Sequence, residues 1–125
     1  MPDWKPAGYP SLSPYLISGR AEAAIAFMEQ AFGATLLRRF DRPDGSLMHA
    51  EVRIDDGVLM IGGATGGYAQ AETHLHLYVP DAQATFDRAV AAGGTVVQEM
   101  SRKEDGDLRG GVSDGCGTTW WIGQQ

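Results

Sequence analysis

Three histidines and one glutamate are the side chains of this 125-residue chain whose types and spacing suit chemistry. His49 and Glu51 stand two positions apart, and so do His74 and His76. Residues two apart in a β-strand point to the same side, so each pair shares one face. Imidazole and carboxylate groups suit zinc, nickel or iron. His49, Glu51 and His74, with His76 beside them, therefore form one candidate metal site. In the alternative interpretation these groups hydrogen-bond a ligand or water.

The alternation of apolar residues predicts which face of each strand these groups occupy. Between residues 74 and 79 the odd positions are apolar, and between 49 and 54 the even positions are apolar. An apolar set of this kind packs on a helix, which sends the other set to the concave side of the sheet. The same parity adds residues from the first, fourth and last strands. The candidate ligand-binding residues are Tyr15, His49, Glu51, Met60, His74, His76, Tyr78 and Trp121.

The aromatic members of this set favour a flat or apolar ligand. An indole and a thioether offer stacking, sulfur contacts and apolar surface, and Trp121 is the leading ligand contact. Trp120 has the opposite parity and is predicted to lie in the core. Aromatic surface mixed with a few polar groups is typical of a small-molecule pocket. We therefore expect a cleft that receives a small aromatic molecule.

An internal repeat predicts how these strands are arranged. When the sequence is shifted by 61 positions, residues 13–63 align with 74–124 without a gap. Identities recur on the helix face, at the helix stop, in a turn and in the final strand, which indicates a duplicated unit. We predict one module over about 11–63, a linker over about 64–72 and a second module over about 73–125, within the single domain 1–125.

Each half of the repeat shows the pattern of a strand, a helix and three further strands. Apolar residues recur at helical spacing in 21–32 and 82–90. Gly33 and the pair Gly93-Gly94 stand where a helix ends, and Asp81 can cap the second helix. The expected strands cover 14–17, 35–40, 47–54 and 58–61, then 74–79, 95–100, 108–113 and 118–122. The predicted fold class is α+β, with two tandem βαβββ modules forming a curved mixed sheet around a cleft.

The order and spacing of several short segments resemble a known family. These segments are Tyr15-Leu16, Ala31-Phe32-Gly33-Ala34, Asp44-Gly45, Met48-His49-Ala50-Glu51, Val79-Pro80-Asp81, Arg109-Gly110-Gly111-Val112 and Trp120-Trp121-Ile122. Together they resemble a PhnB-like member of the glyoxalase/bleomycin-resistance/dioxygenase (vicinal oxygen chelate) superfamily, over nearly the whole chain. The sequence departs from the family at Asp114-Gly115-Cys116-Gly117, where Asp-Pro-Phe-Gly is usual. The fold implied by the resemblance is the paired βαβββ unit.

The resemblance also implies where a metal would bind. Enzymes of the superfamily hold a divalent metal with side chains from four equivalent strand positions. Carried over to this sequence, the positions are Ser13, Met60, His74 and Trp121, of which only His74 is an ordinary ligand. Stable catalytic sites generally use about three protein ligands and water. The resemblance therefore implies that the inherited metal site has been lost and that no cofactor is needed.

Two functions follow as expectations from this resemblance. Metal-free members such as the bleomycin-resistance proteins bind drugs without changing them, which predicts sequestration of an aromatic, antibiotic-like ligand. The alternative is a metal-dependent glyoxalase-like lyase, isomerase or dioxygenase using zinc, nickel or iron. Members of the superfamily commonly pair, so the resemblance implies a homodimer. Whether the cleft forms within one chain or across two remains open at this point.

Composition and charge exclude other classes of partner. The formal net charge of −6 and the lack of a basic stripe argue against nucleic acid. The acidic charge either attracts a cationic ligand or keeps the protein soluble. No segment approaches the roughly 18 uninterrupted apolar residues of a membrane helix. The start of the chain lacks the layout of a secretory signal, and the single Cys116 has no disulfide partner, so we expect a cytoplasmic protein.

Overall fold

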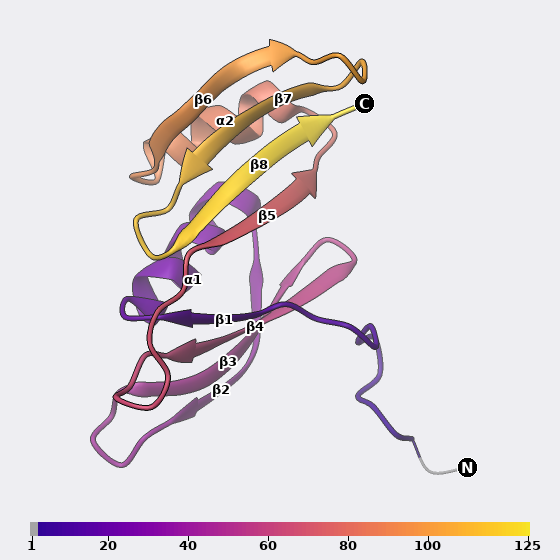
Figure 1. Ribbon diagram of the computed structural model, residues 1–125. Helices are drawn as coiled ribbons and strands as arrows, with labels where there is room; N and C mark the ends of the chain where they lie inside the picture. The colour runs from indigo at the N-terminus through magenta and orange to yellow at the C-terminus, as the bar shows by residue number, and fades with distance from the viewer. Residues whose placement is uncertain (1–2) are drawn as a thin grey trace.

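In the computed structural model, which describes residues 3–125, two modules of identical element order follow one another (Figure 1). The first consists of β1 (Tyr15–Ser18), α1 (Ala21–Phe32), β2 (Thr35–Asp41), β3 (Leu47–Ile54) and β4 (Gly57–Gly63). The second consists of β5 (Thr73–Tyr78), α2 (Ala82–Ala91), β6 (Thr95–Arg102), β7 (Leu108–Ser113) and β8 (Thr118–Gln124). The predicted α+β fold of two tandem βαβββ modules is confirmed.

Each module forms a four-stranded mixed sheet of its own. The strand orders are β1-β4-β3-β2 and β5-β8-β7-β6. β1 runs parallel to β4 and β5 runs parallel to β8, while the other neighbours are antiparallel. A parallel neighbour requires a crossover connection, which α1 and α2 supply. Within residues 3–125 no strand of one sheet pairs with a strand of the other, so β1 and β5 each keep one free edge.

The two helices begin and end where the sequence indicates. α1 ends at Gly33, whose φ of 67° lies in the left-handed region that favours glycine. The side chain of Asp81 accepts a hydrogen bond from the backbone N–H of Ala84 at 3.0 Å and so caps α2. Among residues 3–125 neither helix is long and apolar enough to cross a bilayer.

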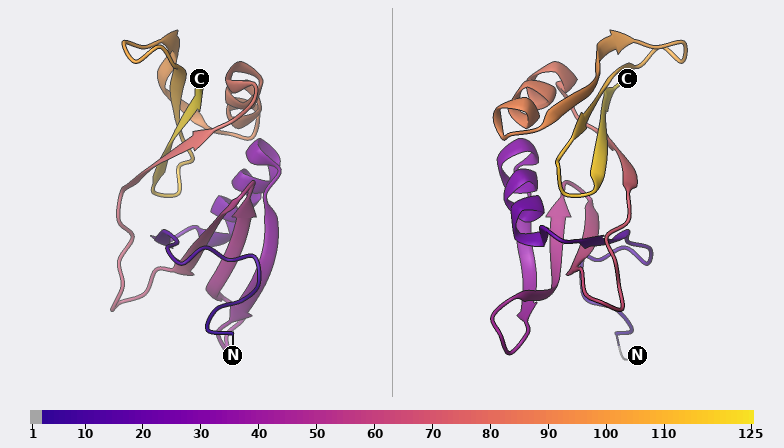
Figure 2. Two further views of the ribbon diagram at one scale, coloured as in Figure 1. Left: turned by 90° about the vertical axis from the view of Figure 1, so that its right-hand side faces the viewer. Right: turned by 60° about the vertical axis from the view of Figure 1, so that its left-hand side comes forward.

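The core lies between the helices and one face of each sheet. α1 and α2 pack against each other, and both views of Figure 2 show them next to one another. Met28, Val52 and Val112 are fully buried there. Phe32 of α1 packs on Trp120 of β8, with ring centroids 4.7 Å apart, and so ties the two modules together. The core therefore joins the modules through their helix-covered faces and leaves the opposite face of each sheet free of helices.

The internal repeat is not gapless, which corrects the alignment made from sequence. Tyr15 and His76, on the first strands, keep the spacing of 61 residues. In the third strands, however, His49 pairs with Gly62 whereas Arg109 pairs with the equivalent Gly123, a spacing of 60. The spacing is already 60 at the start of the second strands, where Thr35 pairs with Arg53 and Thr95 pairs with Ser113, so the extra residue of the first module lies between β1 and β2. Arg109 therefore occupies in module two the place that His49 has in module one.

Candidate functional site

Strand alternation places every predicted ligand-binding residue on the helix-free face of one of the two sheets. Trp120 is only 2% exposed on the core side, whereas its neighbour Trp121 is half-buried on the other side, as the parity predicts. Residues opposite one another in the ladders share a face. The module-one face is the group Tyr15, Arg38, Phe40, His49, Glu51 and Met60. The module-two face is the group His74, His76, Tyr78, Arg109, Gly111 and Trp121.

The two faces lie on two separate sheets of the chain. His49 and Glu51 belong to the first sheet, whereas His74 and His76 belong to the second. Among residues 3–125 no group of three His, Cys, Asp or Glu side chains is placed to hold a metal ion. The metal site predicted from His49, Glu51 and His74 is therefore not assembled in a single chain. Parity predicts the face of a residue, but not which faces meet.

Glu51 is the centre of the module-one face. Its side chain is 4% exposed and accepts hydrogen bonds from Tyr9 Oη at 2.6 Å, Arg38 Nε at 2.7 Å and His49 Nε2 at 2.8 Å. Burial alone would raise the pKa of Glu51, but the hydrogen bonds from Arg38, Tyr9 and His49 outweigh it and hold the pKa at about 2. Glu51 is therefore an anion whose oxygens are already occupied by donors.

An aromatic surface lies beside this buried anion. Tyr15 Oη lies 3.1 Å from His49 Nδ1, and the two rings are stacked with centroids 5.5 Å apart. Tyr15 is 53% exposed, and Phe40 lies next to His49 with its ring also exposed. A pocket of about 540 Å³ opens beside Tyr15, where Met48 and Tyr68 contribute to its wall. The rings of Tyr15 and Phe40 and the thioether of Met48 thus lie near the carboxylate of Glu51, whose charge is paired with Arg38.

Two residues that hold Glu51 were missed by sequence reasoning. Arg38 pairs with Glu51 across β2 and β3, so extending the parity argument to β2 would have found it. Tyr9 lies in the segment before β1 and reaches back over the first sheet, where Arg53 also donates to the carbonyl of Gly8. No local pattern predicts such a return, because it depends on the path of an irregular segment.

Trp121 and His74 form the aromatic part of the module-two face. Trp121 Nε1–H donates to His74 Nδ1 at 3.1 Å, and the planes of the two rings differ by 17°. Gly111 lies opposite Trp121 in the ladder, and a Cβ built on Gly111 would lie 2.6 Å from the indole. The absence of a side chain at Gly111 therefore lets the indole lie against the backbone of β7.

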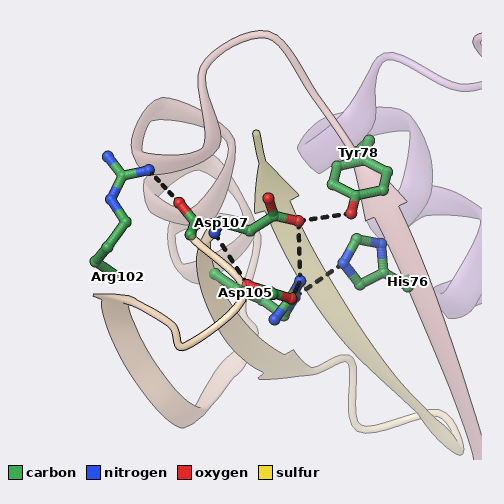
Figure 3. A network of polar contacts seen from close by, with 7 residues as sticks. His76, Tyr78, Arg102, Asp105 and Asp107 are labelled. Atoms are coloured by element: carbon green, nitrogen blue, oxygen red, sulfur yellow. Dashed lines mark hydrogen bonds and ion pairs between the residues drawn. The ribbon is translucent and has the colours of Figure 1, made fainter.

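A polar network surrounds His76 at the other end of this face (Figure 3). Arg109 Nε donates to His76 Nε2 at 3.0 Å, while the other arm of Arg109 donates to Asp105 at 2.9 Å and Asp107 at 3.1 Å. Tyr78 Oη donates to Asp107 at 2.6 Å. Burial, followed by the charge of Arg109, lowers the pKa of His76 and favours its neutral form. Asp105 and Asp107 lie in a turn, where strand parity makes no prediction.

A divalent metal does not fit the positions that metal-binding relatives use. Met60 offers a thioether, and an indole such as that of Trp121 has only an N–H donor. Because Trp121 donates to Nδ1 of His74, the neutral imidazole of His74 carries its own proton on Nε2. His74 therefore has no lone pair left for a metal in this arrangement.

Comparisons with known proteins agree with the fold. The sequence model of the Glyoxalase/Bleomycin resistance protein/Dioxygenase superfamily matches residues 12–122. Protein Mb0911c of Mycobacterium bovis is 39% identical over 126 residues, covering 92% of this chain and 83% of that protein.

Among solved structures, TioX from Micromonospora sp. ML1 has a TM-score of 0.77 at 24% identity, covering 92% of this chain and 98% of that one. The PhnB protein from Bacillus cereus has a TM-score of 0.73 at 15% identity, covering 93% and 100%. At these identities the two structures establish a shared fold. The resemblance found in the sequence is confirmed, and the chain belongs to the Glyoxalase/Bleomycin resistance protein/Dioxygenase superfamily.

Proposed function

We propose that the protein binds and sequesters a small aromatic, antibiotic-like molecule without the help of a metal. The observation that carries this proposal is the placement of Trp121, close over Gly111 and hydrogen-bonded to His74, at a position where metal-binding relatives have a ligand. An indole held in this way is suited to stacking on a flat ring. Tyr15 and Tyr78, which are 53% and 59% exposed, add aromatic surface to the two faces.

The cleft is proposed to form between two copies of the chain. Each open face is a sheet surface with exposed rings and no helix over it, and exposed apolar surface of this kind marks ligand or protein contacts. One face alone covers only one side of a flat molecule. A homodimer in which the module-one face of one copy meets the module-two face of the other would cover both sides.

The proposal is tested by titrating planar aromatic compounds, such as naphthalene, quinoline and anthracycline ring systems, while the tryptophan fluorescence is recorded. We expect Trp121→Ala to weaken binding by about 1–3 kcal/mol, because stacking and buried aromatic area are both lost. Trp4→Ala is the matched control, since Trp4 is 78% exposed in the N-terminal segment and should be neutral for binding. Equal affinities for Trp121→Ala and the unaltered protein would contradict the proposal.

Elemental analysis separates this proposal from a metal-dependent lyase, isomerase or dioxygenase. Protein purified without chelator should hold far less than one equivalent of transition metal per chain, because His74 offers no free lone pair. About one equivalent of zinc, nickel or iron, lost on changing His74 to alanine, would refute the metal-free function.

A further inference from the structure

His74 and Trp121 form one flat platform on the module-two face. Their rings are joined by the hydrogen bond from Nε1–H to Nδ1, with centroids 6.2 Å apart and planes that differ by 17°. The N–H of an indole and the lone pair of an imidazole both lie in the plane of their ring. Two nearly parallel rings linked by such a bond therefore lie edge to edge, and their surfaces continue one another.

Glycines lie beneath Trp121 of the platform and beneath the neighbouring His76. A Cβ on Gly111 would lie 2.6 Å from Trp121 Cζ3, and a Cβ on Gly123 would lie 2.9 Å from His76 Nε2. Trp121 thus lies close over the backbone of β7, and His76 lies close over the backbone of β8. Since β7 covers one side of the indole, the side that faces away from β7 is the one that a ligand can contact.

The partners of the two histidines determine where each imidazole carries its proton. Trp121 and Arg109 can only donate, so the nitrogens that they reach, His74 Nδ1 and His76 Nε2, must both accept. In the neutral rings the proton then lies on His74 Nε2 and on His76 Nδ1. Within residues 3–125 neither of these N–H groups has a protein partner, and both side chains are exposed.

The carboxylates near the platform already accept hydrogen bonds from neighbouring side chains. Asp107 accepts hydrogen bonds from Tyr78 and Arg109, and Asp105 accepts one from Arg109. The net charge of −6 would by itself favour a cationic ligand. At the platform, however, the N–H groups of His74 and His76 that have no partner within residues 3–125 are donors, so a ligand that binds there needs acceptors.

We infer that the module-two face selects an aromatic ligand that carries an oxygen acceptor on a flexible arm, such as an arylacetate. Its ring stacks on the His74–Trp121 platform, and the arm bends out of the ring plane so that the carboxylate accepts from His74 Nε2–H and His76 Nδ1–H at the edge of the platform. This inference rests on the proposed binding function and names the ligand class. Arg109 serves as a positioning residue, because its donation to Nε2 leaves the proton of the neutral His76 ring on Nδ1.

The protonation of the two rings is tested directly by NMR. Long-range ¹H–¹⁵N spectra of the ¹⁵N-labelled protein, recorded above the pH at which imidazoles titrate, report which ring nitrogen carries the proton. We expect a single form for each ring, Nε2–H in His74 and Nδ1–H in His76. Trp121→Phe removes the donor to His74, so it should give a mixture for His74 and leave His76 unchanged. A proton on Nδ1 of His74 in the unaltered protein would overturn the inference.

The ligand class is tested with two naphthalene derivatives that share one ring system. 2-Naphthylacetate offers only acceptors, whereas 2-naphthylmethylammonium, with the same methylene spacer, offers only donors. We expect 2-naphthylacetate to bind at least about tenfold more tightly, and His74→Phe to cost about tenfold for 2-naphthylacetate alone, the range of one hydrogen bond to a charged group.

The outcomes separate this inference from the proposed function. Tighter binding of the ammonium compound, with quenched Trp121 fluorescence, would overturn the acceptor requirement and leave sequestration standing. If neither compound binds, the ligand class fails even where the NMR spectra show the expected protons. A His74→Phe variant that weakens both compounds equally would also contradict it, because a lost platform rather than a lost donor would then explain the effect.

Discussion

Glu51 makes the stability of the folded chain sensitive to acid. Its pKa in the folded protein is about 2, against an ordinary value of 4.5, so the unfolded chain takes up a proton first as the pH falls. The contribution of Glu51 is complete above pH 4.5 and is lost as the pH falls from 4.5 toward 2. A shift of this size corresponds to about 3 kcal/mol of unfolding free energy.

We therefore expect Glu51→Gln to remove about 3 kcal/mol at neutral pH and to flatten the pH dependence in that window. Urea unfolding at a series of pH values measures both effects. Glu104→Gln is the control, because Glu104 is exposed in the turn between β6 and β7 and should leave the curve unchanged. A Glu51→Gln protein that loses stability with acid as steeply as the unaltered one would rule out this role.

At the level of single residues, the sequence predicts faces better than contacts. Parity assigned Trp120 to the core and Trp121 to the open side, because it depends only on strand geometry. It could not predict that Trp121 donates to His74, since that depends on rotamers and on the space over Gly111. The role of Arg109 was missed for a different reason. The one-residue change of spacing between the modules puts Arg109, and not Gly110, in the place equivalent to His49.

At the level of elements, the sequence predicted the bounds of some strands correctly and ended others too early. β3 and β7 have the predicted bounds, Leu47–Ile54 and Leu108–Ser113. β4 was predicted to end at Ile61 but continues to Gly63, because glycine lacks strand propensity although its backbone pairs normally. Gly62 leaves room for Tyr15, since a Cβ there would lie 3.1 Å from the Tyr15 hydroxyl, which would have to shift.

The segment before β1 is the element that the sequence left without a role. Tyr9 anchors this segment to the first sheet through its hydrogen bond to Glu51, and the guanidinium of Arg38 lies 5.6 Å from the centre of the Tyr9 ring. Tyr9→Phe should lower the free energy of unfolding by about 1–2 kcal/mol, because a hydrogen bond to a charged group is lost. Urea unfolding measures the loss, and limited proteolysis of the segment should become faster.

Tyr68→Phe is the matched control for this prediction. The hydroxyl of Tyr68 is exposed in the connection between the modules, so its removal should change stability by less than about 0.5 kcal/mol. In a double-mutant cycle, Tyr9→Phe should have little further effect in a Glu51→Gln background. Equal losses in the two backgrounds would show that the hydroxyl does not act through Glu51.

At the level of the whole molecule, the separation of the two sheets determines where a cleft can form. Sequence reasoning left open whether the cleft lies within one chain or between two, because a repeat predicts two similar modules and not their mutual placement. In the structure the helices pack together, and within residues 3–125 no strand of one sheet pairs with the other, so the module-one and module-two faces of one chain lie on separate sheets. In a twofold dimer the module-one face of each copy can meet the module-two face of the other copy, which gives two equal clefts.

Mixing two damaged variants tests this arrangement. Tyr15→Ala damages the module-one face and Trp121→Ala damages the module-two face, so either variant alone has two damaged clefts per dimer. If the clefts form between chains, a mixed dimer has one cleft with both faces intact and one with both faces damaged. Random exchange of equal amounts makes half of the dimers mixed, so about a quarter of all clefts should regain the affinity of the unaltered protein. Sedimentation of the mixture checks that dimers are present. Dimers that show no recovered high-affinity sites after exchange would place each cleft within a single chain, because in that case no exchange of partners can restore it.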